Sequence, residues 1–335
     1  MYLKKKWIHF VKYKVKILRK TWEEWNRLWI ILTIFIITLV FGFDIIFKEL
    51  KCFLSREEIV YHRGMPLIFI SEVFSSGSGL LLDLLDSHPD IRCIQTIPSV
   101  YYLYNLTHKN SIHHKEKIRL AEAGVTRKVL GSANAAFFLE QFALSGEAAP
   151  RLCYNDPITM KGAMYFNFLF PRAKFILLVR DGRGMVHDLL HKTNATYNDY
   201  ANRLMEWNTE SSHLVVNCVR LGEMKCMIVR FEQLVLQTAA VLEEVLHFLH
   251  VPWSKEVFRE DNLRFVTDNT GDIKNLSDWL GRIPNEVDIF APALGILGYD
   301  LRMANYDKMT PVRLSEIDIS DIMKDEFSLL FKDDI

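Results

Sequence analysis

A loop of small residues lies between an apolar run and a Leu-rich helical pattern. The stretch FISEVFSSGSGLLLDLLDSHPD begins at Phe69, and residues 74–79 (FSSGSG) form its loop. Such a loop at the start of a helix presents backbone N–H groups and the positive end of the helix dipole, which together bind phosphate or sulfate. This loop has no Lys or Arg, and Glu72 precedes it. The sequence therefore predicts an anion-binding backbone that lacks its usual cationic side chains.

Three short apolar runs must position this loop. They are residues 66–73, 174–179 and 226–231, and helical patterns separate them. Short apolar strands alternating with helices predict an α/β fold, with a parallel sheet flanked by helices. Ligands of such sheets bind beyond the carboxyl ends of the strands. We therefore expect the loop at 74–79, the turn RDGR at 180–183 and the segment after Val229 at one edge of the sheet.

The remaining elements are predicted from the spacing of apolar residues. The longest helical pattern spans 198–221, with apolar side chains at near-helical spacing. We expect further helices at 79–87, 133–146, 157–169, 184–192 and 237–250, and a short strand at 91–93. Residues 94–131 show little pattern.

Charge and motifs argue against several function classes. The 335 residues include 41 Lys plus Arg and 41 Asp plus Glu, so net charge predicts no nucleic-acid partner. The chain has neither a Walker GxxxxGK[ST] motif nor a GxGxxG motif. The 11 histidines are scattered, and His113-His114 is interpreted as a surface pair. We expect no metal site.

The first 47 residues have the pattern of a membrane anchor. Residues 1–27 form a basic arm, and residues 28–47 form an apolar run long enough for a transmembrane helix. A cleaved signal peptide would have a shorter apolar region, and a buried core helix would show a polar face. The positive-inside rule places the basic arm in the cytosol. We expect a single-pass type II membrane protein with a stem at 48–65 and the remainder in the lumen.

A lumenal location permits disulfides. Cys218 and Cys226 flank a turn-like segment, whereas Cys93 and Cys153 end two segments that could meet in the fold. Cys52 is left over, and unpaired buried thiols are the alternative interpretation. Three glycosylation sequons fit a lumenal chain, at Asn105, Asn194 and Asn275.

Long ordered blocks of the sequence resemble the tyrosylprotein sulfotransferase family. They are LDSHPDIRC (85–93), LFPRAKFILLVRDGR (169–183), LGEMKCMIVRFEQLVL (221–236), FLHVPW (248–253), LSDWLGRIP (276–284) and IFAPALGILGYD (289–300). Members of that family are type II Golgi enzymes that transfer a sulfuryl group from 3′-phosphoadenosine 5′-phosphosulfate to protein tyrosines.

The resemblance implies a sulfotransferase-type, P-loop-like α/β domain over residues 66–305, followed by a tail at 306–335. It also implies the disulfides Cys93–Cys153 and Cys218–Cys226, the sulfonucleotide as cofactor, acidic tyrosine-containing segments as partners, and dimerisation.

The anion-binding loop departs from the family pattern Pro-Arg-Ser-Gly-Thr-Thr. The positions here are Phe74, Ser75, Ser76, Gly77, Ser78 and Gly79. Ser75 replaces the arginine, and Gly79 lacks the second threonine hydroxyl. Gly77 is kept, so the resemblance implies a cradle of unchanged shape with less charge.

The residues of proton transfer and phosphate binding also differ. The family base is a glutamate after an Arg-Cys pair, where this chain has Gln95 and Thr96, and Pro98 replaces a nearby arginine. Neither Gln nor Thr can accept the proton of a phenol. Asn155 replaces the family lysine in the run CYNDP. No catalytic residue of the family is therefore intact at these positions.

The nucleotide-binding positions are partly kept. Arg180 matches the arginine that clamps the 3′-phosphate, but Asp188 replaces its partner serine and Phe231 replaces a tyrosine. The basic loop that covers the nucleotide is shortened to about 267–275. We hypothesise that Asp188 pairs with Arg180 in place of the phosphate; the alternative is an Asp188 that faces solvent.

Other side chains could compensate for the lost groups. Lys161, Arg151, Arg183 and Lys192 are candidate cations, and Lys192 lies where the family has an arginine. The alternative is that all four are solvated surface charges. Glu72, which replaces a glycine, is either a displaced base or a source of repulsion.

Two functions follow from these substitutions. One is a degenerate Golgi pseudoenzyme that does not bind the sulfonucleotide well and instead binds tyrosine-containing segments or pairs with an active relative. The other is an active, divergent protein-tyrosine sulfotransferase. Ser75, Thr96, Asn155 and Asp188 separate the two hypotheses.

Overall fold

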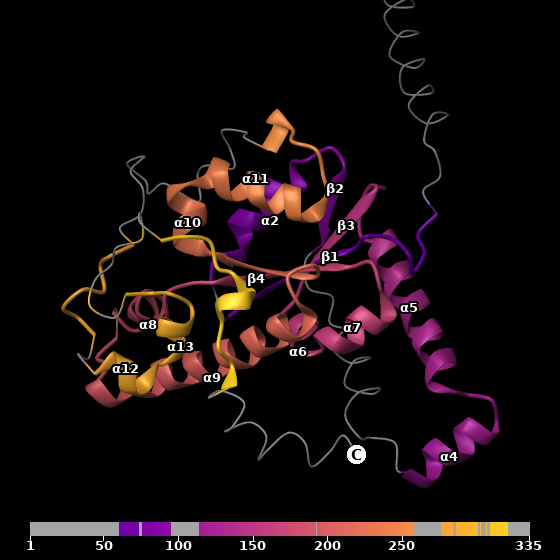
Figure 1. Cartoon of the computed structure of the whole chain (residues 1–335), viewed down its shortest axis with the longest axis horizontal. Coiled ribbons are helices and arrows are strands. Elements are labelled where there is room, and N and C mark those ends of the chain that lie inside the picture. The colour runs from indigo at the N-terminus through magenta and orange to yellow at the C-terminus, as the bar shows by residue number, and fades with distance from the viewer. Residues whose placement is uncertain are drawn as a thin grey trace, which may run out of the picture. The chain divides into compact units, whose positions relative to one another are not determined.

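The computed structural model describes residues 60–73, 76–94, 114–191, 193–257, 276–283, 286–300 and 309–320, together with residues 302 and 306. Its sheet contains β1 (Ile68–Glu72), β2 (Ile91–Ile94), β3 (Arg151–Asn155), β4 (Lys174–Val179) and β5 (Cys226–Arg230). The strand order is β2-β3-β1-β4-β5, and every pairing is parallel. The predicted parallel sheet is confirmed (Figure 1).

Helices cover both faces of the sheet because its strands are apolar on both faces. Phe69, Phe175 and Leu177 point into one core, whereas Ile70 and Ile176 point into the other. The first core is closed by α5 (Arg127–Leu144), α6 (Pro157–Lys161), α7 (Ala163–Leu169) and α9 (Tyr197–Leu221). The second is closed by α2 (Ser78–Asp86), α10 (Phe231–Leu236) and α11 (Thr238–Leu249). Figure 1 shows the two groups on opposite sides of the sheet.

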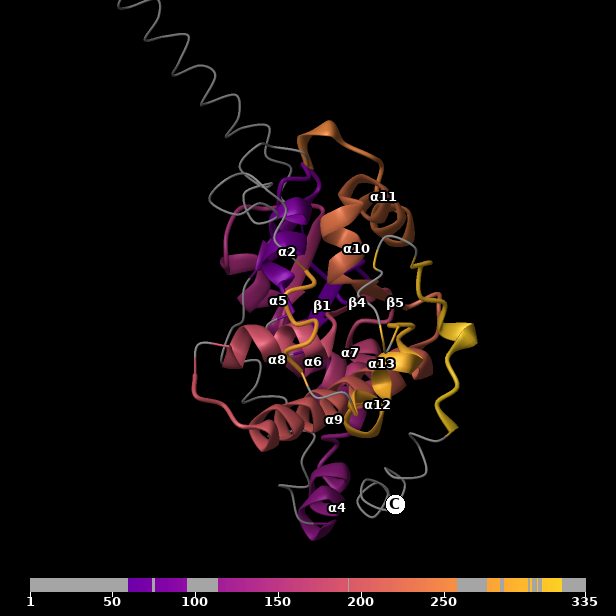
Figure 2. The same cartoon turned by 90° about the vertical axis from the view of Figure 1, so that its left-hand side faces the viewer.

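The other elements lie around this framework. α8 (Gly182–Leu190) packs beside α9, as the turned view in Figure 2 shows. The remaining elements are α4 (His114–Glu122), η1 (Lys255–Val257), α12 (Val287–Phe290), α13 (Ala293–Ile296) and η4 (Leu314–Glu316).

Several elements differ from the prediction. The expected helix at 157–169 is two helices, because Gly162 ends α6 and begins α7. α5 begins at Arg127, where the side chain of Thr126 accepts the Val129 N–H and caps the helix. α4 lies within the segment that shows little pattern, and β3 was not expected. At five residues, β3 is too short and too polar at its ends for periodicity to identify.

Both implied disulfides are present. Cys93–Cys153 joins β2 to β3, and the two residues are directly opposite in the strand register. Cys218–Cys226 joins the last turn of α9 to the first residue of β5. The interpretation of these four cysteines as unpaired thiols is therefore wrong.

The anchor prediction falls outside the residues that the structure describes. Those residues exclude the basic arm, the apolar run at 28–47 and Cys52. Among the helices that are described, none has the length and apolarity needed to span a bilayer. Of the predicted stem, residues 60–65 are described: Arg63 donates hydrogen bonds to the carbonyls of Leu169 and Phe168, and Met65 is buried.

Candidate anion-binding site

Three strands bring the predicted loops to one edge of the sheet. β1 and β4 are in register at Glu72 and Leu178, and β4 and β5 are in register at Val179 and Arg230. Each of the three strands is followed by a helix, namely α2, α8 and α10. The starts of these helices therefore lie at the carboxyl ends of the strands, where an α/β sheet binds its ligands.

In the described part of the loop before α2, Gly77 has the backbone conformation expected of an anion cradle. Gly77 has φ 89° and ψ 30°, a left-handed conformation at the helix N-cap. A Cβ on Gly77 would lie 2.4 Å from the ring of Phe231, so no other residue fits without movement. Ser76 is buried, and its hydroxyl donates a hydrogen bond to the carbonyl of Val73.

A carboxylate of the chain itself occupies this cradle. The Glu72 Oε2 atom accepts a hydrogen bond of 3.1 Å from the N–H of Ser78, the first residue of α2. At the end of β3, the Asn155 side-chain amide donates to the Ser78 hydroxyl at 3.1 Å. Because Glu72 lies at the positive end of α2, it stabilises the helix start as a bound anion would, by about 0.3–1 kcal/mol.

The retained arginine, Arg180, forms an ion pair with a second carboxylate, that of Asp188. The Arg180 Nη2 atom lies 2.5 Å from the Asp188 Oδ2 atom, and the Arg180 guanidinium also stacks 5.3 Å from the centre of the Phe231 ring. The Arg180 side chain is 18% exposed and that of Asp188 is 53% exposed. The predicted pairing is confirmed. The further hypothesis, that Asp188 takes the place of a phosphate, stays a prediction.

Three of the four candidate compensating cations have other partners. Arg183 is fully buried, donates two hydrogen bonds to Asp181 at 2.9 and 2.7 Å, and stacks 3.9 Å from the Trp279 ring centre. Its interpretation as a solvated charge is therefore wrong. Lys161 pairs with Glu210 at 2.8 Å.

Arg151 lies on the wrong side of the sheet for this site. It begins β3, at the amino edge of the strands, and donates to the carbonyls of Leu249 and His250. Lys192 lies outside the described residues.

A buried acid that the sequence prediction missed lies beside the site. Glu232 accepts the Asp181 N–H at 2.9 Å and the Tyr299 hydroxyl at 3.0 Å. Burial, with the nearby charge of Asp181, raises the pKa of Glu232 to about 7. Tyr306 donates to Asp181 at 2.9 Å and accepts from Trp279 at 2.9 Å. This buried network links the chain after residue 276 to the strand ends, and a Glu directly after an apolar strand was the one sequence signal for it.

The structure thus brings together part of the predicted site. Gly77, Ser78, Asn155 and Arg180 lie around the strand ends with Asp188 and Phe231. Gly79 is exposed on the first turn of α2. Several predicted positions lie outside the described residues, namely Ser75, Gln95, Thr96, Pro98, Lys192, Asn105, Asn275 and the shortened loop at 267–275.

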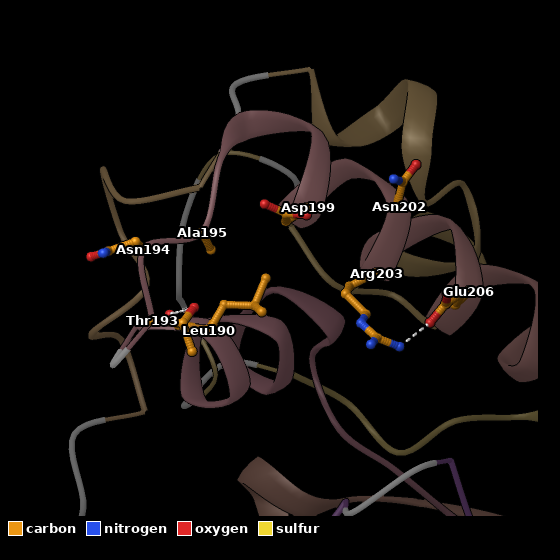
Figure 3. Close-up of a pocket in the computed structure, with 8 residues that line it drawn as sticks. All are labelled: Leu190, Thr193, Asn194, Ala195, Asp199, Asn202, Arg203 and Glu206. Carbon is orange, nitrogen blue, oxygen red and sulfur yellow. Dashed lines mark hydrogen bonds and ion pairs between the residues drawn. The ribbon is translucent and has the colours of Figure 1, made fainter.

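A separate hollow lies where α8 leads into α9. Its volume is about 430 Å³, and its lining residues are Leu190, Thr193, Asn194, Ala195, Asp199, Asn202, Arg203 and Glu206 (Figure 3). Arg203 points to Glu206, and the two form an ion pair of 2.6 Å. The lining includes neither the α2 loop nor Arg180, so this hollow is not the predicted anion site. Asn194, one of the sequon residues, is exposed at its rim.

Known proteins resemble this chain over most of its length. The Sulfotransferase family matches residues 66–255. The protein-tyrosine sulfotransferase of Drosophila melanogaster is 38% identical over 269 residues, which are 72% of this chain and 53% of that protein. The chain thus spans about half the length of that relative. Protein-tyrosine sulfotransferase 1 of Rattus norvegicus is 38% identical over 308 residues, which are 81% of this chain and 82% of that protein.

A solved structure is also similar, although distantly. The sulfotransferase domain from the Synechococcus PCC 7002 olefin synthase has 19% identity and a TM-score of 0.43, and the match covers 73% of this chain and 98% of that domain. The family is shown instead by the sequence matches, whose 38% identity extends over most of both this chain and the rat protein. On that ground the chain belongs to the protein-tyrosine sulfotransferase family.

Proposed function

We propose that this chain is a catalytically degenerate member of its family, held in the Golgi membrane as a type II protein. One observation carries the proposal: among the described residues at the sheet edge, two anion-binding groups are bound to carboxylates of the chain itself. Asp188 binds Arg180, and Glu72 binds the N–H of Ser78. Side chains of the protein itself therefore take the places at which an anionic ligand would bind.

The sulfonucleotide that the family and its fold imply does not fit this arrangement. To bind the Arg180 Nη2 group, a phosphate must displace Asp188, and to bind the N–H of Ser78 it must displace Glu72. The exposed pair with Asp188 is itself weak, at about 0–1 kcal/mol. The displaced carboxylate, however, remains beside a doubly charged phosphate and repels it.

Substitutions at the reacting centre support the same conclusion. The positions of the family arginine and lysine hold Ser75 and Asn155, and the position of the family base holds Thr96. Loss of one preorganised donor lowers a rate by about 10²–10³, and loss of a general base by about 10²–10⁴. Although such factors do not multiply cleanly, together they remove most of the expected acceleration.

The proposed role is binding, without catalysis. The domain would hold acidic, tyrosine-containing segments of secretory proteins, or pair with itself or with an active relative. Support for the lumenal location comes from the basic arm and apolar run at 1–47, the two disulfides and the exposed sequon residue Asn194.

An active, divergent protein-tyrosine sulfotransferase is the second candidate. It is favoured by the backbone cradle, whose Gly77 keeps the left-handed conformation next to Phe231. In that case the chain would transfer a sulfuryl group from 3′-phosphoadenosine 5′-phosphosulfate to tyrosine with substitute side chains.

Calorimetry with 3′-phosphoadenosine 5′-phosphate tests the carboxylate argument. We expect no measurable binding by the unchanged full chain. The double variant Glu72→Gly, Asp188→Ser should gain measurable binding, because two repelling charges are gone. Glu243→Gln, which removes an exposed charge on α11, is the control and should change nothing. Micromolar binding by the unchanged chain would contradict the proposal.

A transfer assay separates the two candidates directly. With labelled sulfonucleotide and an acidic tyrosine peptide, the degenerate protein should give no product. Turnover at an ordinary enzymatic rate would instead establish the active, divergent enzyme.

A further inference from the structure

Three side chains at the end of α8 form a cluster that shares Asp188 with the anion site. His187, Asp188 and His191 each offer a ligand atom, and these atoms all lie within 4.8 Å of one another. Residues four apart on a helix share one face, and the two imidazole rings stack with centroids 5.2 Å apart and planes at 18°. We propose that these three side chains form a binding site for a divalent transition-metal ion, and that this ion is zinc.

The Nδ1 atom of His187 is buried and could bind a metal ion. The residue is 4% exposed, and its Nδ1 atom has no hydrogen-bond partner among the residues that the structure describes. Buried polar atoms are normally bonded, so this nitrogen calls for an explanation. An imidazole nitrogen with a free lone pair is the commonest side-chain ligand of transition metals.

His191 is oriented as a metal ligand. Its Nδ1 atom lies 3.1 Å from the carbonyl oxygen of His187 and 3.0 Å from that of Asp188. Carbonyl oxygens only accept hydrogen bonds, so Nδ1 carries the proton and Nε2 keeps its lone pair. A backbone carbonyl on one ring nitrogen, with the other nitrogen available, is the arrangement by which proteins orient metal-binding histidines.

Asp188 supplies the third ligand without leaving Arg180. Its Oδ2 atom binds Arg180, whereas Oδ1 lies 3.8 Å from the His187 Nδ1 atom, too far for a hydrogen bond. An ion between these two atoms would bind Oδ1, while Arg180 holds the other oxygen as an outer partner. The pair with Arg180 thus fixes the carboxylate in a position suited to the ion.

One contact opposes the ion and must change. The Arg282 Nη1 atom lies 3.4 Å from the His187 Nε2 atom. Binding through Nδ1 places the ring proton on Nε2, where it faces the Arg282 guanidinium. Arg282 is exposed, so its side chain can turn into solvent. The negative charge of Asp278, which also acts on His187, favours the cation.

The types of the three ligand atoms indicate which metal ion the site would bind. Two imidazole nitrogens and one carboxylate oxygen suit zinc, and three protein ligands leave one coordination position open. Asp188 and His191 are exposed, so the open position faces solvent. The proposal departs from the expectation of no metal site, because α8 brings scattered histidines and a carboxylate assigned to Arg180 onto one face.

Calorimetry with Zn²⁺ and absorption with Co²⁺ test the site in the full chain purified without a polyhistidine tag. We expect one ion per chain, with Co²⁺ giving the bands of tetrahedral coordination. His191→Ala and Asp188→Asn should each weaken binding by at least about 10–100-fold, because even outer partners of a metal have effects of that size.

His247→Ala, which removes an exposed histidine of α11, is the matched control and should bind as the unchanged chain does. His191 is exposed, so its replacement leaves the core intact, and thermal unfolding with a chelator present verifies this. Equal binding by His191→Ala and the unchanged chain, or no saturable binding at all, would overturn the proposal.

Discussion

Gly77 is the residue on which the shape of the anion cradle depends. Its φ of 89° is unfavourable for any residue with a Cβ, and that Cβ would also meet the Phe231 ring at 2.4 Å. We expect Gly77→Ala to lower the free energy of unfolding by at least about 1–2 kcal/mol, as measured by chemical denaturation.

Gly79→Ala is the matched control for that substitution. It lies in the first turn of α2, where a Cβ would meet nothing within 4 Å. The change should leave stability unaltered or raise it by about 0.4–1 kcal/mol. Equal losses from the two substitutions would mean that the conformation of Gly77 is not the cause.

The two carboxylates differ in how far the sequence predicted them. Asp188 was expected to meet Arg180, because the family resemblance places it where a serine partners that arginine, and the pair is present. The hydrogen bond from Ser78 to Glu72 was not expected. It depends on the local path of the loop backbone, which residue types do not specify.

Glu232 connects elements that lie far apart in the sequence. As part of α10 it binds the Asp181 N–H at the start of α8, and it also binds Tyr299, which follows α13. Burial raises its pKa from 4.5 to about 7, so the folded protein holds a proton that the unfolded chain has released. The folded state is therefore most stable when Glu232 is protonated, because burial outweighs the two hydrogen bonds that favour its carboxylate.

The raised pKa of Glu232 predicts a pH dependence of stability. The contribution of Glu232 is fully present below pH 4.5 and is lost as the pH rises to about 7, a change of about 3 kcal/mol. Glu232→Gln, which mimics the protonated acid, should flatten this part of the curve of unfolding free energy against pH. The exposed Glu243→Gln should leave the slope unchanged; identical curves for both variants would exclude Glu232 as its source.

Periodicity predicted the elements that are long or apolar, and it failed where neither condition holds. β4 and α9 lie within a residue of their expected ends, because burial on both faces or on one helix face leaves a plain pattern. β3 is five residues long and ends in Asn155, and α4 is polar, so neither has such a pattern. The buried Glu232 was missed because its partners Asp181 and Tyr299 lie far away in the sequence.

The two disulfides constrain the folded molecule over different lengths of chain. Cys93–Cys153 closes a loop of 60 residues that contains α4 and α5. It joins β2, at the edge of the sheet, to β3. Cys218–Cys226 closes only 8 residues, between α9 and β5. A crosslink stabilises a protein mainly by restricting its unfolded state, and the effect grows with the length of the loop.

Removal of each disulfide should therefore have a different effect on the whole molecule. The loop-entropy relation gives about 4 kcal/mol for Cys93→Ser with Cys153→Ser, and about 2–3 kcal/mol for Cys218→Ser with Cys226→Ser. Chemical denaturation of both double variants measures the order directly, and each serves as the control for the other. If the short loop proves the more stabilising, the crosslinks act on the native packing around α9 and β5, and the unfolded-state argument is wrong for this chain.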